Sequence, residues 1–152
     1  MAGWTNKGKE ACLDVWLRGT AAETNTYIAL LTDASGPTAS GNTMSDYTEV
    51  TAGNGYTSGG RLLTPGATDF DTLTEDDGNS RGLIQLKDIA WTASGGNLPN
   101  SSNGARYAVL TDDNGTVSAR EIYCYWDLSS ARIVSDTQTL TLQDCEIRIN
   151  ES

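Results

Sequence analysis

Hydrophobic residues change their spacing at Gly19, and this change limits the chain to a small set of folds. Before Gly19, apolar residues recur at the three- and four-residue intervals of one helical face. After it, they alternate with polar residues or form short apolar runs, as in β-strands. Sequences such as Asn-Gly, Gly-Gly and Pro-Gly separate these later segments, and they are typical of turns. The pattern predicts one N-terminal helix followed by β-structure.

The predicted helix covers about residues 5–18. Thr5 is a good N-cap residue, and Gly19 suits the left-handed conformation in which many helices end. Its apolar face is formed by Gly8, Ala11, Cys12, Leu13, Val15, Trp16 and Leu17. We expect this face to pack on a sheet, and the alternative is that it docks on a partner. The candidate interface residues are Leu13, Trp16, Leu17 and Trp4, which precedes the helix and is the best candidate for an intersubunit anchor.

About seven or eight strands are expected after the helix. The strand candidates are residues 26–32 (apolar enough for burial on both faces), 47–51, 61–64, 82–92, 106–111, 120–128 and 137–150, with residues 69–81 as a solvated loop or hairpin. In the last strand the apolar positions change parity after Leu142. This predicts a β-bulge near Gln143–Asp144, although a change of face at a sandwich edge would produce the same pattern.

A mainly β fold is the simplest architecture that fits these elements. We expect one domain over residues 1–152, an antiparallel β-sandwich of immunoglobulin-like or jelly-roll type with one N-terminal α-helix.

The composition excludes several kinds of chemistry. Because the chain has no histidine, Ser-His-Asp and Cys-His catalytic systems and histidine zinc sites are impossible. Twenty acidic and ten basic residues give a net charge of −10, which disfavours nucleic acid and anionic membranes as partners. No signal peptide or membrane-spanning segment is recognisable, so we expect synthesis in a cytoplasm.

Two acidic segments are candidates for calcium binding, because carboxylates are the hard oxygen ligands that calcium prefers. They are residues 69–77 and residues 112–115. Neither has the spacing of a known calcium loop, so solvated turns are the simpler interpretation. The glycines between Gly53 and Gly60 lack the lysine and the following helix of a phosphate-binding loop. No catalytic, cofactor-binding or metal-binding residue is predicted, and no cofactor.

The three cysteines are predicted to be buried, unpaired thiols. Cys12, Cys124 and Cys145 all lie among apolar residues. A disulfide between Cys124 and Cys145 on neighbouring strands is the alternative, and it would require Cα atoms within about 7 Å.

Four segments occur in an order and spacing that resemble a known group of proteins. They are the helix followed by residues 27–31, then residues 50–60, 91–96 and 105–110. From about Ala11 onward, the chain resembles small accessory structural proteins of tailed bacteriophages. The resemblance implies a non-enzymatic, β-rich virion component, first of all a capsid decoration or cement protein on the outer capsid surface.

The resemblance also implies the partners. They are the major capsid protein and further copies of the chain, with a trimer expected at a local three-fold position of the capsid. The N-terminal segment or the exposed loops would make the contact. The alternative is a tail- or fibre-associated virion protein that binds carbohydrate. An enzyme acting on cell-surface glycans is less favoured, because no pair of carboxylates lies in a recognisable motif. An adhesin-like domain is disfavoured because no signal peptide is recognisable.

Overall fold

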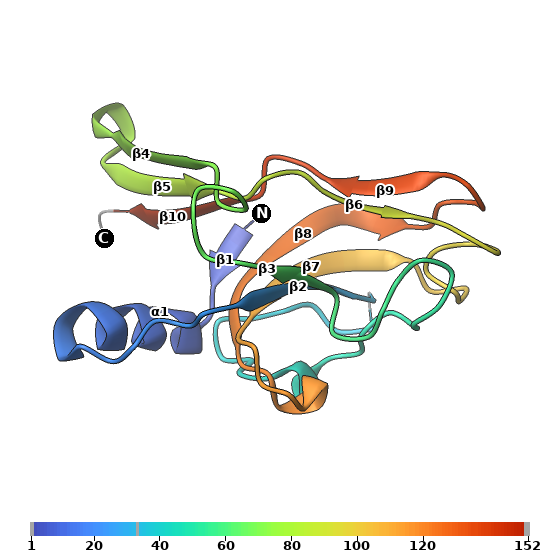
Figure 1. The fold of residues 1–152 in the computed structure, drawn as a ribbon, viewed down its shortest axis with the longest axis horizontal. Coiled ribbons are helices and arrows are strands. Elements are labelled where there is room, and N and C mark those ends of the chain that lie inside the picture. The colour runs from blue at the N-terminus through green and yellow to red at the C-terminus, as the bar shows by residue number, and fades with distance from the viewer. Residues whose placement is uncertain (1, 33, 151–152) are drawn as a thin grey trace.

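The computed structural model describes residues 2–32 and 34–150, so residues 1, 33 and 151–152 of the expected domain lie outside the described part (Figure 1). Its elements are β1 (Ala2–Trp4), α1 (Asn6–Leu13), the π-helical turn η1 (Asp14–Arg18), β2 (Thr26–Leu31), η2 (Met44–Asp46), β3 (Arg61–Leu63), β4 (Thr72–Asp76), η3 (Asp77–Asn79), β5 (Arg81–Gln85), β6 (Ile89–Thr92), β7 (Ala105–Thr111), η4 (Val117–Ala119), β8 (Ile122–Arg132), β9 (Thr139–Leu142) and β10 (Glu146–Asn150). The expected fold class is confirmed, because the chain is mainly β, with antiparallel sheets and one N-terminal helix.

The strands form two layers. A five-stranded antiparallel sheet has the order β1-β8-β7-β2-β3. The second layer consists of the two-stranded sheet β6-β9, which lies above the first sheet in Figure 1, and the three-stranded sheet β10-β5-β4, which continues it end to end beyond the first sheet and above α1. The chain passes from β5 to β6 and back from β9 to β10, so the second layer is one long ribbon with a break in its middle.

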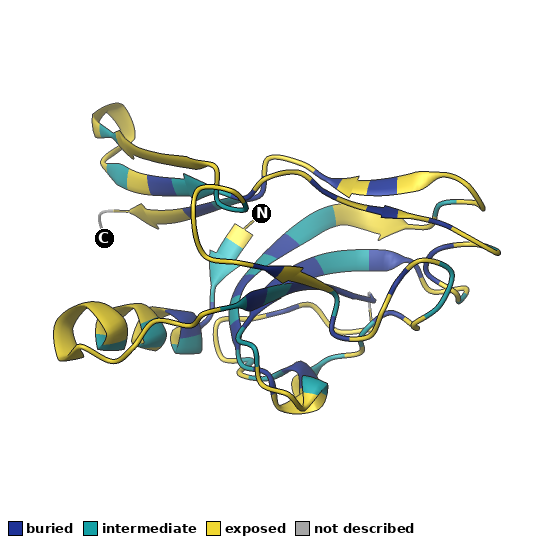
Figure 2. Ribbon diagram, in the orientation of Figure 1, coloured by how far each residue is buried: buried dark blue, intermediate teal, exposed yellow. Residues whose placement is uncertain are grey.

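The main core lies between these layers. Ile28 of β2, Leu110 of β7 and Trp126 of β8 pack in one cluster with residues of the second layer such as Trp91 and Leu140. A second, smaller cluster covers the other face of the five-stranded sheet and consists of Ala29, Leu31, Met44, Val109 and Ile122. Strand β2 is therefore buried on both faces, as its composition predicts (Figure 2).

The predicted long strand over residues 82–92 is wrong, because the structure divides it into β5 and β6, which belong to different sheets. The apolar residues Leu83, Leu86 and Ile89 recur every third position. A regular strand cannot direct all three to one face, because its side chains alternate with a period of two. Between the two strands the backbone leaves the pairing of β5 with β10 and β4, and the N–H of Leu86 donates a hydrogen bond to the carbonyl of Cys145 at 2.9 Å.

The predicted bulge near Gln143–Asp144 marks a break between two strands. Strand β9 pairs with β6, and β10 pairs with β5. Asp144 lies between them with a φ of 53°, a left-handed conformation that ends the regular strand. The bulge itself is wrong, and the second possibility, a change of direction at the edge of a sandwich, is closer to this arrangement.

Residues 47–51 do not form the predicted strand, and only a single bridge joins Glu49 to Leu31. The following Gly-rich segment is a turn, as expected. Gly53 and Tyr56 exchange backbone hydrogen bonds of 2.8 and 3.0 Å, and Asn54 and Gly55 have positive φ angles of 50° and 98°. The residue pattern therefore identified the turn but overestimated the regularity of the chain before it.

Candidate interaction surface

The helix is attached to the sheet through its first turn. Thr5 is fully buried, and its hydroxyl accepts a hydrogen bond from the N–H of Gly8 at 2.9 Å, which confirms the predicted N-cap. The same hydroxyl contacts the carbonyl oxygens of Ile122 and Tyr123 in β8. A Cβ atom on Gly8 would lie 2.2 Å from the carbonyl oxygen of Tyr123, so only glycine permits this close approach of helix and strand.

Trp4 connects three strands within the chain. It belongs to β1, which pairs with β8, and its indole N–H donates to the carbonyl of Arg148 in β10 at 2.7 Å. Its ring is partly buried against the main core. This candidate anchor therefore has an internal role, and its hydrogen-bond donor is already used.

Beyond the first turn, the helical segment leaves the sheet. Among the residues of α1, only Gly8 is buried, and η1 has no buried residue. The predicted packing of the apolar face on a sheet is therefore wrong for most of its length. Four large apolar side chains, here called the helix surface, are exposed: Leu13 (53%), Val15 (39%), Trp16 (81%) and Leu17 (67%). Gly19 ends the segment with a φ of 74°, as its position predicted.

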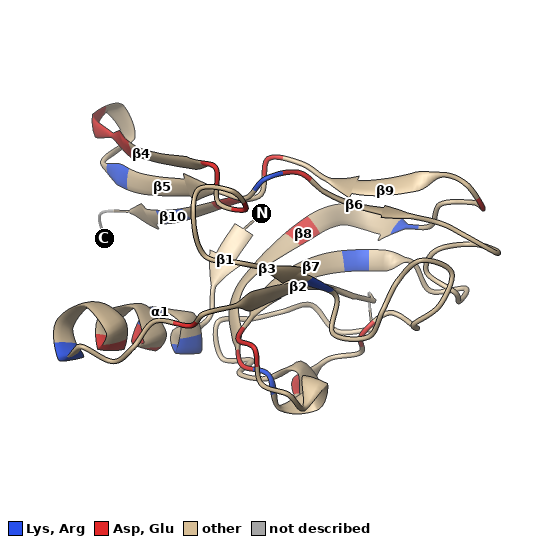
Figure 3. Cartoon of the chain, in the orientation of Figure 1, with Lys and Arg blue, Asp and Glu red and all other residues tan. Residues whose placement is uncertain are grey.

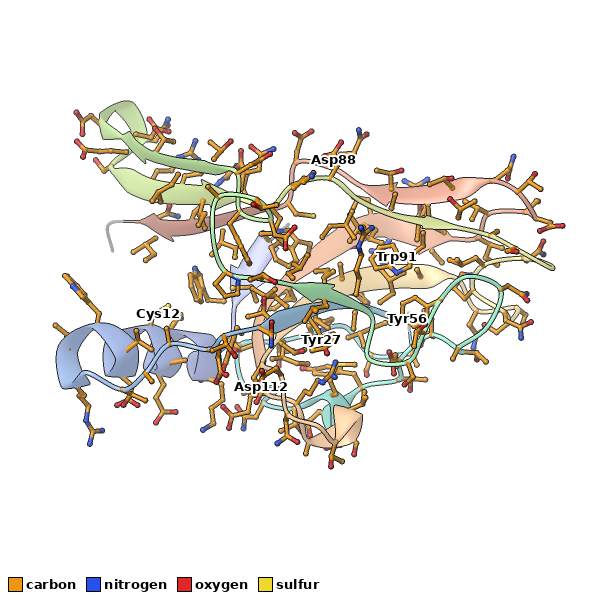
Figure 4. The ribbon with its side chains drawn as sticks, viewed as in Figure 1. Cys12, Tyr27, Tyr56, Asp88, Trp91 and Asp112 are labelled. Atoms are coloured by element: carbon orange, nitrogen blue, oxygen red, sulfur yellow. The ribbon has the colours of Figure 1, made fainter. Side chains whose placement is uncertain are left out.

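A groove of about 730 Å³ separates this segment from the sheet β10-β5-β4. Val15 and Trp16 line it on the helical side, and Ile147 and Ile149 line it on the side of β10. Cys12 also lines the groove, on the side of α1 that faces the sheet (Figure 4). Its side chain is exposed, so the prediction of burial is wrong for this cysteine.

The other two cysteines are buried, as predicted. Neither Cys124 nor Cys145 forms a disulfide, so the alternative of a bridge between them is not present. Burial raises the pKa of the Cys145 thiol to about 11 and also raises that of Cys124. A high pKa keeps a thiol protonated and a poor nucleophile at neutral pH.

The carboxylates of the two acidic segments bind nearby groups of the chain. Asp69 accepts a hydrogen bond from the N–H of Thr64 at 2.8 Å, and Asp76 pairs with Arg81 at 2.7 Å. Asp112 accepts from the N–H of Glu121 at 3.0 Å. No group of three or more Cys, Asp or Glu residues within 2–32 and 34–150 has an arrangement that would hold a metal ion. These carboxylates stabilise local structure by accepting backbone and side-chain hydrogen bonds.

Four groups near the base of the helix form an acidic cluster, here defined as Glu23, Asp112, Asp113 and Glu121. Partial burial and the charges of Asp113 and Asp112 raise the pKa of Glu23, and burial raises that of Asp112. The hydroxyl of Tyr123 donates to Glu23 at 3.4 Å, and Lys7 pairs with Glu121 at 3.3 Å. Like charges are therefore held close together where the chain leaves the helix for β2.

A buried polar network that was not predicted fixes the loop before β3. The Glu49 carboxylate accepts hydrogen bonds from the hydroxyl of Tyr56 at 2.8 Å and from the N–H of Gly59 at 2.5 Å. Arg120 is also buried, stacks 3.7 Å from the ring centre of Tyr27 and donates to the carbonyl of Gly59 at 2.9 Å. Glu49 and Arg120 thus hold the backbone of Gly59 from two sides, which indicates a structural role.

A second hollow, of about 550 Å³, lies between β8 and β9 and is lined by Asp127, Arg132 and Thr141 among other residues. Trp126 also borders it, but this side chain is only 6% exposed and its indole N–H donates to the carbonyl of Glu146. Its ring is therefore not available as a platform on which a sugar could stack.

Within the described residues, no helix has the length and apolar character needed to cross a bilayer. No protein-family model, curated protein or solved structure matches the chain. The helix surface and the groove beside it are thus the features from which a function can be argued.

Proposed function

We propose that this protein is a non-enzymatic structural component of a tailed-phage virion, most directly a decoration or cement protein on the outer surface of the capsid. One observation carries the proposal: the helix surface projects from a well-packed β core and leaves Leu13, Trp16 and Leu17 exposed. An exposed group of large apolar side chains is typical of a protein-interaction site. The resemblance of the sequence to phage accessory proteins supplies the kind of partner.

The distribution of charge supports the same proposal. Residues 6–18 carry three basic and two acidic side chains, so this segment has one excess positive charge. The rest of the chain carries seven basic and eighteen acidic residues, an excess of eleven negative charges. A strongly acidic exterior keeps densely displayed copies soluble but makes them repel one another. The helical segment combines exposed apolar side chains with a small excess of positive charge, which suits it to make the contact.

Binding to empty capsid shells tests this function. We expect the purified protein to sediment with shells that lack it, at a copy number comparable with that of the major capsid protein. The double variant Trp16→Ser, Leu17→Ser should lose this binding, because it removes the apolar contact while leaving the core intact. The matched control is Leu62→Ser with Ile133→Ser, which changes two side chains that are 47% and 45% exposed elsewhere.

The outcomes separate the alternatives. Retained binding of the double variant would show that another surface makes the contact. Failure of the native protein to bind shells, together with association with tails or fibres, would support the tail-associated alternative instead.

A further inference from the structure

Asparagine is followed directly by glycine at Asn54, Asn103 and Asn114. Such a pair can modify itself, because the backbone nitrogen of the glycine can attack the side-chain carbonyl carbon (Cγ) of the asparagine. A succinimide ring forms, ammonia leaves, and water then opens the ring to a carboxylate. Glycine favours this attack because it has no side chain to hinder closure of the ring. The surroundings of each pair therefore decide which of them reacts.

Two of the pairs are held in place by the fold. The side chain of Asn54 donates to the carbonyl of Asn97 at 2.8 Å, and a Cβ atom on Gly55 would lie 2.1 Å from a neighbouring carbonyl oxygen. Gly104, which follows the second asparagine, is buried, and a Cβ atom there would lie 2.8 Å from the backbone nitrogen and oxygen of Arg132. Closure of the ring turns the peptide group of the glycine, and these contacts oppose that movement.

The third pair lies in the exposed loop between β7 and β8. Asn114 and Gly115 are exposed, and no atom of the described residues lies within 4 Å of a Cβ atom at Gly115. The side-chain oxygen of Asn114 accepts a hydrogen bond from the N–H of Thr116 at 2.9 Å. This bond closes a turn around the Asn114–Gly115 peptide group, which brings Cγ to the nitrogen that must attack it. It also places a donor on the oxygen where negative charge develops during the attack.

A second donor acts on the main-chain carbonyl of Asn114. The Nε–H of Arg120 donates to this oxygen at 3.0 Å, and the same guanidinium is fixed by its hydrogen bond to the carbonyl of Gly59 at 2.9 Å. A cationic donor on a peptide oxygen makes the adjacent N–H more acidic, which prepares the nitrogen of Gly115 for the attack. The same donor polarises the main-chain carbonyl of the ring, so water adds there more readily.

Carboxylates in the same loop oppose the reaction, because their charge disfavours an anionic nitrogen. Figure 3 shows acidic and basic residues close together between β7 and β8. Asp112, labelled in Figure 4, accepts hydrogen bonds from two backbone N–H groups, at 3.0 and 3.4 Å, and Asp113 interacts with Glu23. These contacts engage the carboxylates with other groups, whereas Arg120 contacts the reacting peptide group directly.

We propose that Asn114 is a site of spontaneous deamidation in the folded protein, with water as the co-reactant and isoaspartate as the main product. The nitrogen of Gly115 gives up its proton and bonds to Cγ, and the Cγ–Nδ2 bond breaks as Nδ2 takes up a proton and leaves as ammonia. Water then adds to the main-chain carbonyl carbon of Asn114, and the bond from this carbon to the nitrogen of Gly115 breaks. The new carboxylate contains the oxygen to which Arg120 donates, so it forms with a cationic partner. This inference is independent of the partner proposed above.

Peptide mapping of the incubated protein tests the proposal. Trypsin, which cuts after lysine and arginine, separates the three pairs into peptides 19–61, 88–106 and 107–120. After incubation of the folded chain at neutral pH, mass spectrometry should find deamidation at Asn114 roughly tenfold or more faster than at Asn54 and Asn103, because only this pair is positioned to react. In urea the three should react at similar rates, since they share the same dipeptide and have lost the fold. Chromatography of the peptide isomers should give a larger fraction of isoaspartate at Asn114 from the folded chain than from the unfolded one.

Two variants separate the chemistry from general flexibility of the loop. Gly115→Ala should lose most of the reaction without a change in thermal unfolding, because the position has space for a methyl group but that group hinders closure of the ring. Thr116→Pro removes the N–H donor at a residue whose φ of −95° is near that of proline, and it should slow the reaction by roughly tenfold.

Deamidation at Asn54 or Asn103 as fast as at Asn114 in the folded chain, or slower reaction of Asn114 in the folded chain than in urea, would overturn the proposal. A Thr116→Pro variant that reacts at the native rate would overturn the role of the turn. Equal isoaspartate fractions from folded and unfolded chains would overturn the role of Arg120.

Discussion

Glu23 shows how a single side chain makes the stability of this fold depend on pH. Partial burial and the neighbouring Asp113 and Asp112 raise the pKa of Glu23 in the folded state. The native chain therefore binds this proton more readily than the unfolded chain, so the contribution of Glu23 to the free energy of unfolding falls as the pH rises through the folded-state pKa. Hydrogen bonds from the backbone of Thr43 and Asn42 lower the pKa of Asp46 in the folded state. The contribution of Asp46 to the free energy of unfolding is therefore lost as the pH falls through its folded-state pKa.

Replacement of Glu23 by glutamine should stabilise the protein at pH 7, by less than about 1 kcal/mol because the side chain is largely exposed despite its partial burial and solvent screens its charge. The gain should disappear below about pH 4, where the native carboxyl group is itself protonated. Urea unfolding of both chains at the two pH values measures the difference. Glu10→Gln is the control, and it should give no gain because Glu10 pairs with Lys7 at 3.3 Å. A Glu23→Gln variant that is less stable than the native chain at pH 7 would contradict the expected repulsion.

At the scale of single elements, the helix depends on one close contact between two backbones. Alanine is normally a better helix residue than glycine by about 1 kcal/mol. At Gly8 this preference is reversed, because the added methyl group would overlap the carbonyl group of Tyr123, which belongs to the rigid strand β8. The contact thus determines the path of the helix as it leaves the sheet.

The substitution Gly8→Ala should therefore destabilise the fold by about 1–3 kcal/mol, the usual cost of overpacking a close contact. Thermal or urea unfolding measures this loss. Gly115→Ala is the matched control, since nothing lies within 4 Å of a Cβ atom at that position, and it should be almost neutral. Equal stabilities of the two variants would show that the helix can shift away from β8 at no cost.

The ends of the helix could be predicted from the sequence because capping is local. Thr5 and Gly19 act on residues only a few positions away, and both have the predicted roles. The division of residues 82–92 into two strands depends instead on which distant strand each half meets. The three-residue spacing of Leu83, Leu86 and Ile89 was a signal for the break, but it did not identify the partners β10 and β9.

The candidate surface was predictable only in part, for the same reason. The spacing of apolar residues identified Leu13, Trp16 and Leu17 as one feature. Their exposure depends on how the helix is placed against distant parts of the chain such as Tyr123, which Gly8 contacts, and helical periodicity contains no information about this placement. The network of Glu49 and Arg120 was missed because a lone charged residue in a sequence does not reveal partners that only the folded chain brings near.

At the scale of the whole molecule, the three thiols report whether the layers are intact. In the folded chain one thiol, that of Cys12, should react with a chromogenic disulfide reagent, and in urea three should react without any reductant. Cys124 and Cys145 are only 3% and 5% exposed, and burial keeps both protonated. The Cys12→Ser variant should show no reactive thiol until it unfolds. If the unfolded native chain gave only one thiol, Cys124 and Cys145 would be joined by a disulfide.

The pairing of β1 with β8 also sets the order in which the molecule can be completed. Ala2, Gly3 and Trp4 lie opposite Trp126, Tyr125 and Cys124, so β1 joins the sheet only after the much later strand β8 has been made. Closing such a long loop is slow, because much chain entropy is lost before any contact forms. Until then the helical segment cannot make its contact with β8, and a nascent chain leaves it detached from the sheet while the intervening strands are made.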